Sequence, residues 1–158
     1  MAKPDAAKHS PAPLHGQQAR NHPVQGAGAL LSTPSDIVRF GFAMLDESLL
    51  RPETLDMLRT PLELESGEST GYGLGWFIRS APLAPETRAT TIFGHSGTSV
   101  GGFTSFITLP EHDIVVAMTT NVSLAADRVP QRFLAEVLPS LSQRLAGIFA
   151  GSEAIAGL

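Results

Sequence analysis

Three apolar segments in the second half of the chain, joined by short polar connections, constrain the fold more than any other feature. They cover residues 90–93, 103–109 and 114–118, and Pro110-Glu111-His112-Asp113 suits a tight turn between the last two. Such a series predicts antiparallel strands, each lying beside the next. The last segment is apolar without alternation, which is typical of a strand covered on both faces. The sequence therefore predicts a sheet with layers above and below it.

A His and a Ser stand between glycines directly after the first of these segments, in Gly94-His95-Ser96-Gly97-Thr98. Glycines at the end of a strand let another backbone come close, and a polar pair beside them can hold what approaches. We therefore expect this stretch to face a ligand. Gly101-Gly102-Phe103 follows it closely and opens the next strand.

A further strand is expected over residues 71–78, where three glycines alternate with larger apolar side chains. On a strand, Gly71, Gly73 and Gly75 would share one face. This bare face favours the close packing of a helix or a neighbouring strand over a ligand surface.

Two helices are predicted before that strand. The first begins at Pro34, with Thr33 as its N-cap and Asp36 as a capping-box acid, and fades near residues 46–48. Its buried face consists of Ile37, Phe40, Met44 and Leu45. The second helix fits residues 52–59, with Leu55 and Leu58 inward, and Pro61 closes it.

The two ends of the chain complete the predicted domain organisation. Pro130 is expected to open a last helix, which Pro139 kinks or breaks, and a second piece follows over residues 140–149. We expect a disordered polar arm over residues 1–25, one domain over residues 26–150 and a frayed tail over residues 151–158.

The composition of the 158 residues excludes several classes of function. The net charge is -4 and Lys and Arg form no cluster, which argues against nucleic-acid binding. There is no Cys, so disulfides and thiolate chemistry are excluded. No apolar run approaches the roughly 20 residues of a membrane span. The N-terminus lacks the apolar core of a signal peptide, and the compartment stays undetermined.

Neither Ser96 nor the histidines fit a known catalytic or metal-binding sequence pattern. Ser96 does not fit the nucleophile elbow G-x-S-x-G, because Thr98 stands where the second Gly belongs. His95 and Ser96 do not form a dyad, because adjacent strand residues point to opposite faces. The remaining histidines lie apart or at loose spacing in the polar arm. A solvated arm is favoured there over the alternative of metal binding, so we predict neither a metal site nor a cofactor. These remaining histidines are His9, His15, His22 and His112.

Several short motifs occur in order between Gly28 and Asn121. They are Gly28-Ala29-Leu30-Leu31-Ser32-Thr33, Asp36-Ile37-Val38-Arg39-Phe40, Leu50-Arg51-Pro52-Glu53-Thr54, Tyr72-Gly73-Leu74-Gly75-Trp76, His95-Ser96-Gly97, Gly102-Phe103 and Asn121. In this order they resemble the C-terminal half of the serine β-lactamase-like hydrolases, which include class C β-lactamases, penicillin-binding proteins and related esterases and D-aminopeptidases. The resemblance implies a partial β-lactamase/transpeptidase-like fold of the α+β class, in which helices pack on an antiparallel sheet of about four strands.

The resemblance also implies a role for each residue of one motif. His95-Ser96-Gly97 looks like the third active-site motif of the family, K-T-G or H-x-G. There the first residue supplies polar or positive character, the second offers a hydroxyl to a substrate carboxylate or carbonyl, and the glycine keeps the strand clear. The resemblance thus makes His95, Ser96, Gly97 and Thr98 substrate-binding residues, with the Thr98 backbone N–H as an oxyanion-hole donor.

The nucleophile and the base of the family have no counterpart in these residues. The family carries both in S-x-x-K, whereas the only lysines here are Lys3 and Lys8, and neither has a Ser three residues before it. The second motif, Y-x-N, is absent too, because Gly73-Leu74 follows Tyr72.

Two interpretations follow from this comparison. The first is the C-terminal part of a serine hydrolase for amides or esters, inactive alone, which takes a small-molecule or peptide substrate only when an N-terminal half completes it. The alternative is a non-catalytic binding or assembly module on the same scaffold. In either case we expect an exposed sheet edge to favour self-association. An α/β-hydrolase is disfavoured by the failed elbow.

Overall fold

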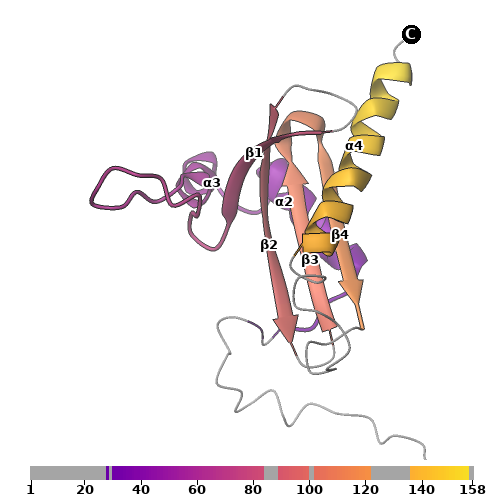
Figure 1. The fold of residues 1–158 in the computed structure, drawn as a ribbon, viewed down its shortest axis with the longest axis horizontal. Coiled ribbons are helices and arrows are strands. Elements are labelled where there is room, and N and C mark those ends of the chain that lie inside the picture. Colours follow the sequence, from indigo (N-terminus) through magenta and orange to yellow (C-terminus); the bar gives the residue numbers. More distant parts are fainter. Residues whose placement is uncertain (1–27, 29, 84–88, 100–101, 122–135, 157–158) are drawn as a thin grey trace, which may run out of the picture. The chain divides into compact units, whose positions relative to one another are not determined.

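The computed structural model describes residues 28, 30–83, 89–99, 102–121 and 136–156. The chain divides into two units, residues 1–31 and 32–158, and every element below belongs to the second. In chain order these are α2 (Pro34–Leu45), α3 (Pro52–Arg59), β1 (Phe77–Pro82), β2 (Ala89–Ser99), β3 (Gly102–Leu109), the short 3-10 helix η2 (Pro110–His112), β4 (Ile114–Thr120) and α4 (Leu138–Ala156) (Figure 1). The predicted polar arm lies outside the described residues, and the domain boundaries stay predictions.

The strands form one antiparallel sheet of four strands in the order β1-β2-β3-β4. The predicted series of neighbouring strands is therefore confirmed, as is the turn before β4, where Asp113, the residue after η2, has φ of 50°. α2 packs behind the sheet and α4 in front of it in Figure 1. β4 is thus covered on both faces, as its unbroken apolar run predicts. The α+β fold expected from the sequence is confirmed.

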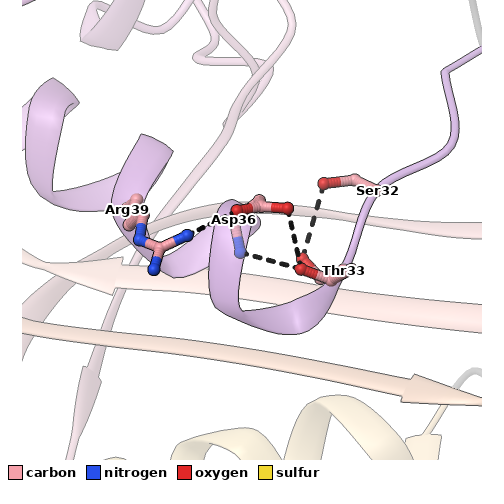
Figure 2. Close-up of polar contacts among 4 residues, drawn as sticks. All are labelled: Ser32, Thr33, Asp36 and Arg39. Carbon is pink, nitrogen blue, oxygen red and sulfur yellow. Dashed lines mark hydrogen bonds and ion pairs between the residues drawn. The ribbon is translucent and has the colours of Figure 1, made fainter.

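Helix α2 begins with the predicted cap (Figure 2). The hydroxyl of Thr33 accepts a hydrogen bond from the backbone N–H of Asp36 at 3.2 Å and donates to the Asp36 carboxylate at 2.9 Å. Arg39 forms an ion pair with the other oxygen of that carboxylate at 2.7 Å. The N-terminal turn is thus held by a chain of three side chains on one exposed helix face.

The buried side of α2 contacts the sheet through a glycine that was not predicted to be buried. Gly41 and Met44 are the buried residues of the helix, whereas Phe40 is 44% exposed. A β-carbon on Gly41 would meet Val115 of β4 and Phe106 of β3. The missing side chain therefore sets how closely α2 approaches the sheet.

Helix α3 has the predicted bounds, and its Leu55 is only 1% exposed. Arg59 in its last turn donates a hydrogen bond to the Met44 carbonyl oxygen. The Arg59 guanidinium also lies 5.3 Å from the centre of the Phe93 ring in β2. Burial lowers the pKa of Arg59, while nearby carboxylates act against this shift. One cation thus joins both helices to the sheet.

A cluster of buried hydrophobic side chains lies between the sheet and α4. It consists of Leu83, Ile92, Ile107, Leu109, Ile114, Ala146 and Ala150. The helix start predicted at Pro130 lies outside the described residues, so the kink or break expected at Pro139 stays a prediction. Residues 136 and 137 are π-helical and lead directly into α4, whose second residue is Pro139. α4 also continues past Phe149 as far as Ala156, into the segment expected to be a frayed tail.

The strand predicted over residues 71–78 is also wrong, since β1 begins only at Phe77. Gly71 and Gly75 have φ of 64° and 85°, which no regular strand contains. The N–H of Gly73 donates to the Trp76 carbonyl at 2.7 Å and closes a tight turn. The expectation of close packing holds at Gly73, where a β-carbon would lie 2.2 Å from the Leu58 carbonyl oxygen.

Candidate functional site

The stretch from Gly94 to Thr98 lies inside β2 and not at the end of a strand, because β2 continues to Ser99. β3 pairs with β2 from Phe93 to Ser99. β1, in contrast, pairs with β2 only as far as Gly94, whose partner is Phe77. Within the described part of the chain, residues 95–99 therefore have a strand neighbour on one side only. We call the other side of residues 95–99, which has no strand neighbour, the open edge.

The register of the sheet decides which backbone groups face the open edge. The N–H of Thr91 donates to the carboxylate of Glu111, just beyond the end of β3, at 3.1 Å, so Thr91 faces β3. Backbone groups of successive strand residues point to opposite edges. The backbone N–H and C=O groups of His95 and Gly97 therefore point toward β3. Those of Ser96 and Thr98 point toward the open edge.

Glu111 fastens the start of β2 to η2. Its carboxylate accepts from the Thr90 hydroxyl at 3.0 Å as well as from the Thr91 N–H. Burial alone would raise the pKa of Glu111. The hydrogen bonds from Thr91, from its own backbone N–H and from Thr90 outweigh this effect and hold the pKa below the ordinary 4.5.

His95 and Ser96 point to opposite faces of the sheet, as the sequence argument against a dyad requires. His95 stands opposite Phe106, which packs toward α2, and Ser96 stands opposite Ser105. Ser105 lies on the α4 side, because its hydroxyl accepts from Ser142 of α4 at 2.9 Å. The two polar side chains thus reach the site from different sides of one strand.

The His95 imidazole has a partner that the sequence reasoning did not identify. Its Nε2 lies 2.7 Å from the hydroxyl of Tyr72, and the two rings meet edge to face with centroids 5.9 Å apart. The one sequence feature that distinguishes this partner is that Tyr72 is the only Tyr in the chain. The distance of 23 residues between them hid the contact.

Aromatic rings line the same face beside His95. Trp76 lies 5.6 Å from Phe106 and 6.3 Å from Phe40, measured between ring centres. Phe106 is 8% exposed, whereas Phe40 is partly open to solvent. The face that bears His95 is therefore apolar around one polar imidazole.

Gly97 and Thr98 are exposed, and nothing lies within 4 Å of the position that a β-carbon on Gly97 would take. Gly94 is the opposite case, since its β-carbon would lie 2.2 Å from the Phe106 carbonyl oxygen. One glycine of the motif is thus required by the packing of the sheet, and the other is not. The structure brings all four predicted substrate-binding residues together on one strand.

No three His, Asp or Glu side chains gather closely enough to hold a metal ion in the described ranges. In the same ranges, no helix is long and apolar enough to cross a membrane. His112 lies in η2, away from the 95–99 stretch in the strand register.

Comparison with known proteins places this chain in a serine hydrolase-like family. Residues 2–138 match the family model described as Beta-lactamase, and the chain belongs to the Beta-lactamase family. Penicillin-binding protein 4* of Bacillus subtilis (strain 168) is similar, with 29% identity over 89 residues. The match covers 56% of this chain but 19% of that relative, so this chain corresponds to a minor part of the relative's length.

Proposed function

We propose that this chain supplies the substrate-binding strand of a β-lactamase-related serine hydrolase, which acts on an amide or ester by acyl transfer. The observation that carries the proposal is the open edge of β2 at His95-Ser96-Gly97. Pairing with β1 does not reach these residues, because Phe77, the first residue of β1, lies opposite Gly94. Membership of the Beta-lactamase family supports it. An unpaired strand edge binds extended ligands through main-chain hydrogen bonds.

In this proposal the substrate lies in the plane of the sheet beside β2. The backbone groups of Ser96 and Thr98 face it, and the Thr98 N–H is one donor to the oxyanion that develops during acyl transfer. Gly97 leaves room for the substrate, since no atom approaches its β-carbon position. His95 and Ser96 meet the substrate from opposite faces of the strand.

The proposed reaction also needs a nucleophile and a base, which the family carries in S-x-x-K. That motif does not occur in the 158 residues. We therefore expect the 158-residue chain to bind but not to turn over a family substrate. The family substrates considered are β-lactams, esters and D-amino-acid peptides.

The absence of chemistry is tested by incubating the chain with benzylpenicillin or a fluorophosphonate and recording its intact mass. We expect no adduct on the chain. A covalent acyl or phosphonyl adduct on any of its residues would overturn the proposed division between binding and catalysis.

The binding role is tested with two substitutions at one position. Thr98→Pro removes the N–H at the open edge without removing a hydrogen bond to β3, and Thr98→Val keeps the N–H and removes only the hydroxyl. The probe is N-acetyl-D-alanyl-D-alanine, followed by backbone amide shifts of residues 95–99. We expect Thr98→Pro to weaken binding about tenfold and Thr98→Val to leave it nearly unchanged. Equal binding by both variants would contradict the role of the amide.

Self-association through an edge of the sheet stays a prediction. β1 and β4 are the outer strands among those described. Sedimentation velocity over a range of concentrations measures it directly, and a monomer at the highest concentration would favour the alternative of a self-contained binding module.

A further inference from the structure

The contact between Tyr72 and His95 goes beyond what the family resemblance assigns to the site. The hydroxyl oxygen of Tyr72 lies 2.7 Å from Nε2 of His95. This distance is short for a neutral hydrogen bond between oxygen and nitrogen, so the contact is well formed. The edge-to-face arrangement of the two rings adds a favourable aromatic contact.

The backbone of Tyr72 is itself held in place by neighbours. Its carbonyl accepts from the Leu62 N–H at 2.9 Å, and its N–H donates to the Thr70 hydroxyl at 3.1 Å. Tyr72 also forms an isolated bridge with Phe77, the first residue of β1. Hydrogen bonds therefore fix the backbone position from which the Tyr72 side chain extends.

His95 needs such an anchor because its side chain is exposed. An exposed imidazole can turn between rotamers unless neighbouring groups hold it. The Phe77 ring flanks it at 6.1 Å, but this ring offers no polar atom to choose between the two nitrogens. Tyr72 does offer one, since which nitrogen carries the proton follows from the hydrogen bond that the other nitrogen makes.

We propose that Tyr72 is a positioning residue, which donates its O–H to Nε2 of neutral His95 and thereby keeps the proton on Nδ1. Because Nε2 is engaged, Nδ1 is the ring nitrogen left to meet a ligand, and it meets the ligand as an N–H donor. When His95 is protonated, Nε2–H donates to the phenol oxygen and Nδ1–H stays a donor. The class of ligand group that fits is an oxygen acceptor, either a carbonyl or a carboxylate. The ligand part of this inference rests on the proposed function, and the tautomer part does not.

Nitrogen-15 NMR of the histidine rings in the complete, ligand-free chain tests the tautomer. At a pH at which the imidazoles are neutral, we expect His95 to show a protonated Nδ1 and an acceptor Nε2. In Tyr72→Phe, which keeps the ring and removes the hydroxyl, the two nitrogens should give the averaged shifts of a mixture of tautomers. His112 is the internal control, and its signals should not change.

Two results would overturn the inference. One is neutral wild-type His95 with its proton on Nε2, which decides the matter even if Tyr72→Phe fails to fold. The other is a folded Tyr72→Phe variant with an unchanged His95 pattern. The wild-type experiment needs no ligand, so its result is independent of the proposed function.

A second arm uses N-acetyl-D-alanyl-D-alanine as the probe. We expect Tyr72→Phe to bind it about fivefold more weakly, as the loss of one net hydrogen bond implies. Unchanged affinity in a variant whose tautomer has shifted would overturn the role of Nδ1 toward the ligand. Failure of the wild type to bind the probe counts against the proposed function and leaves the tautomer result standing.

Discussion

Gly41 of α2 lies so close to Val115 of β4 that a β-carbon on the glycine would come within 2.5 Å of Val115 Cγ1. Valine is β-branched and cannot easily turn away. We expect Gly41→Val to lower the free energy of unfolding by about 1–3 kcal/mol, as overpacking does elsewhere. Urea denaturation measures the change. Adding Val115→Ala should restore part of it, and strictly additive effects of the two substitutions would contradict direct contact.

The two glycines that flank His95-Ser96 should respond differently to the same substitution. Gly94→Ala forces a β-carbon against the Phe106 carbonyl oxygen, and we expect a loss of about 3 kcal/mol or more, at the upper end of overpacking effects. Gly97→Ala meets no atom within 4 Å and should change stability by less than about 0.5 kcal/mol. Thermal unfolding of both variants compares them. Similar losses at the two positions would mean that Gly97 is packed after all.

The cap of α2 should contribute measurably to stability. Thr33→Ala removes the oxygen that accepts from the Asp36 N–H, and we expect a loss of about 1 kcal/mol. Thr33→Ser keeps that oxygen and is the matched control. Arg39→Ala breaks only an exposed ion pair and should cost less than Thr33→Ala. Chemical denaturation of the three variants gives the ranking, and a larger loss for Arg39→Ala would reverse our assignment.

Glu111 should make stability depend on pH in the acid range. Hydrogen bonds hold its pKa below 4.5 in the folded chain, so its ionised form stabilises the fold above the unfolded-state pKa. That contribution falls as the pH drops through the folded-state value. We expect the wild type to be more stable than Glu111→Gln near neutral pH, and the difference to shrink below about pH 4.5. A difference that stays constant into strong acid would rule out this linkage.

Local signals explain which elements could be predicted from the sequence. The cap at Thr33 and the prolines at the starts of α2 and α3 act within a few residues, and both helices were predicted where they occur. The unbroken apolar run of β4 reports burial on two faces, and α2 and α4 supply both layers. These predictions needed no knowledge of distant contacts.

The predictions failed where a pattern had two physical meanings. Alternating glycines between residues 71 and 75 fit a strand as well as a turn, and only the positive φ of Gly71 and Gly75 separates the two. The last helix was also placed too short at its C-terminal end, since α4 continues through Gly151 to Ala156.

The candidate site was predicted only in part. His95-Ser96-Gly97 could be chosen from local glycines and from the family resemblance, because the motif is continuous. Tyr72 could not, since its contact with His95 depends on a turn that brings together residues 23 positions apart. The open edge of β2 was equally hidden, because it depends on where β1 stops pairing.

The unequal lengths of β1 and β2 have one more consequence. β2 extends to Ser99, while its pairing with β1 stops at Gly94 opposite Phe77, the residue that follows the Gly73–Trp76 turn. The length of the open edge is therefore set by a turn in another segment and not by any side chain of β2. A longer or shorter turn would change how many residues of β2 lie along the open edge, without any change in the sequence of β2.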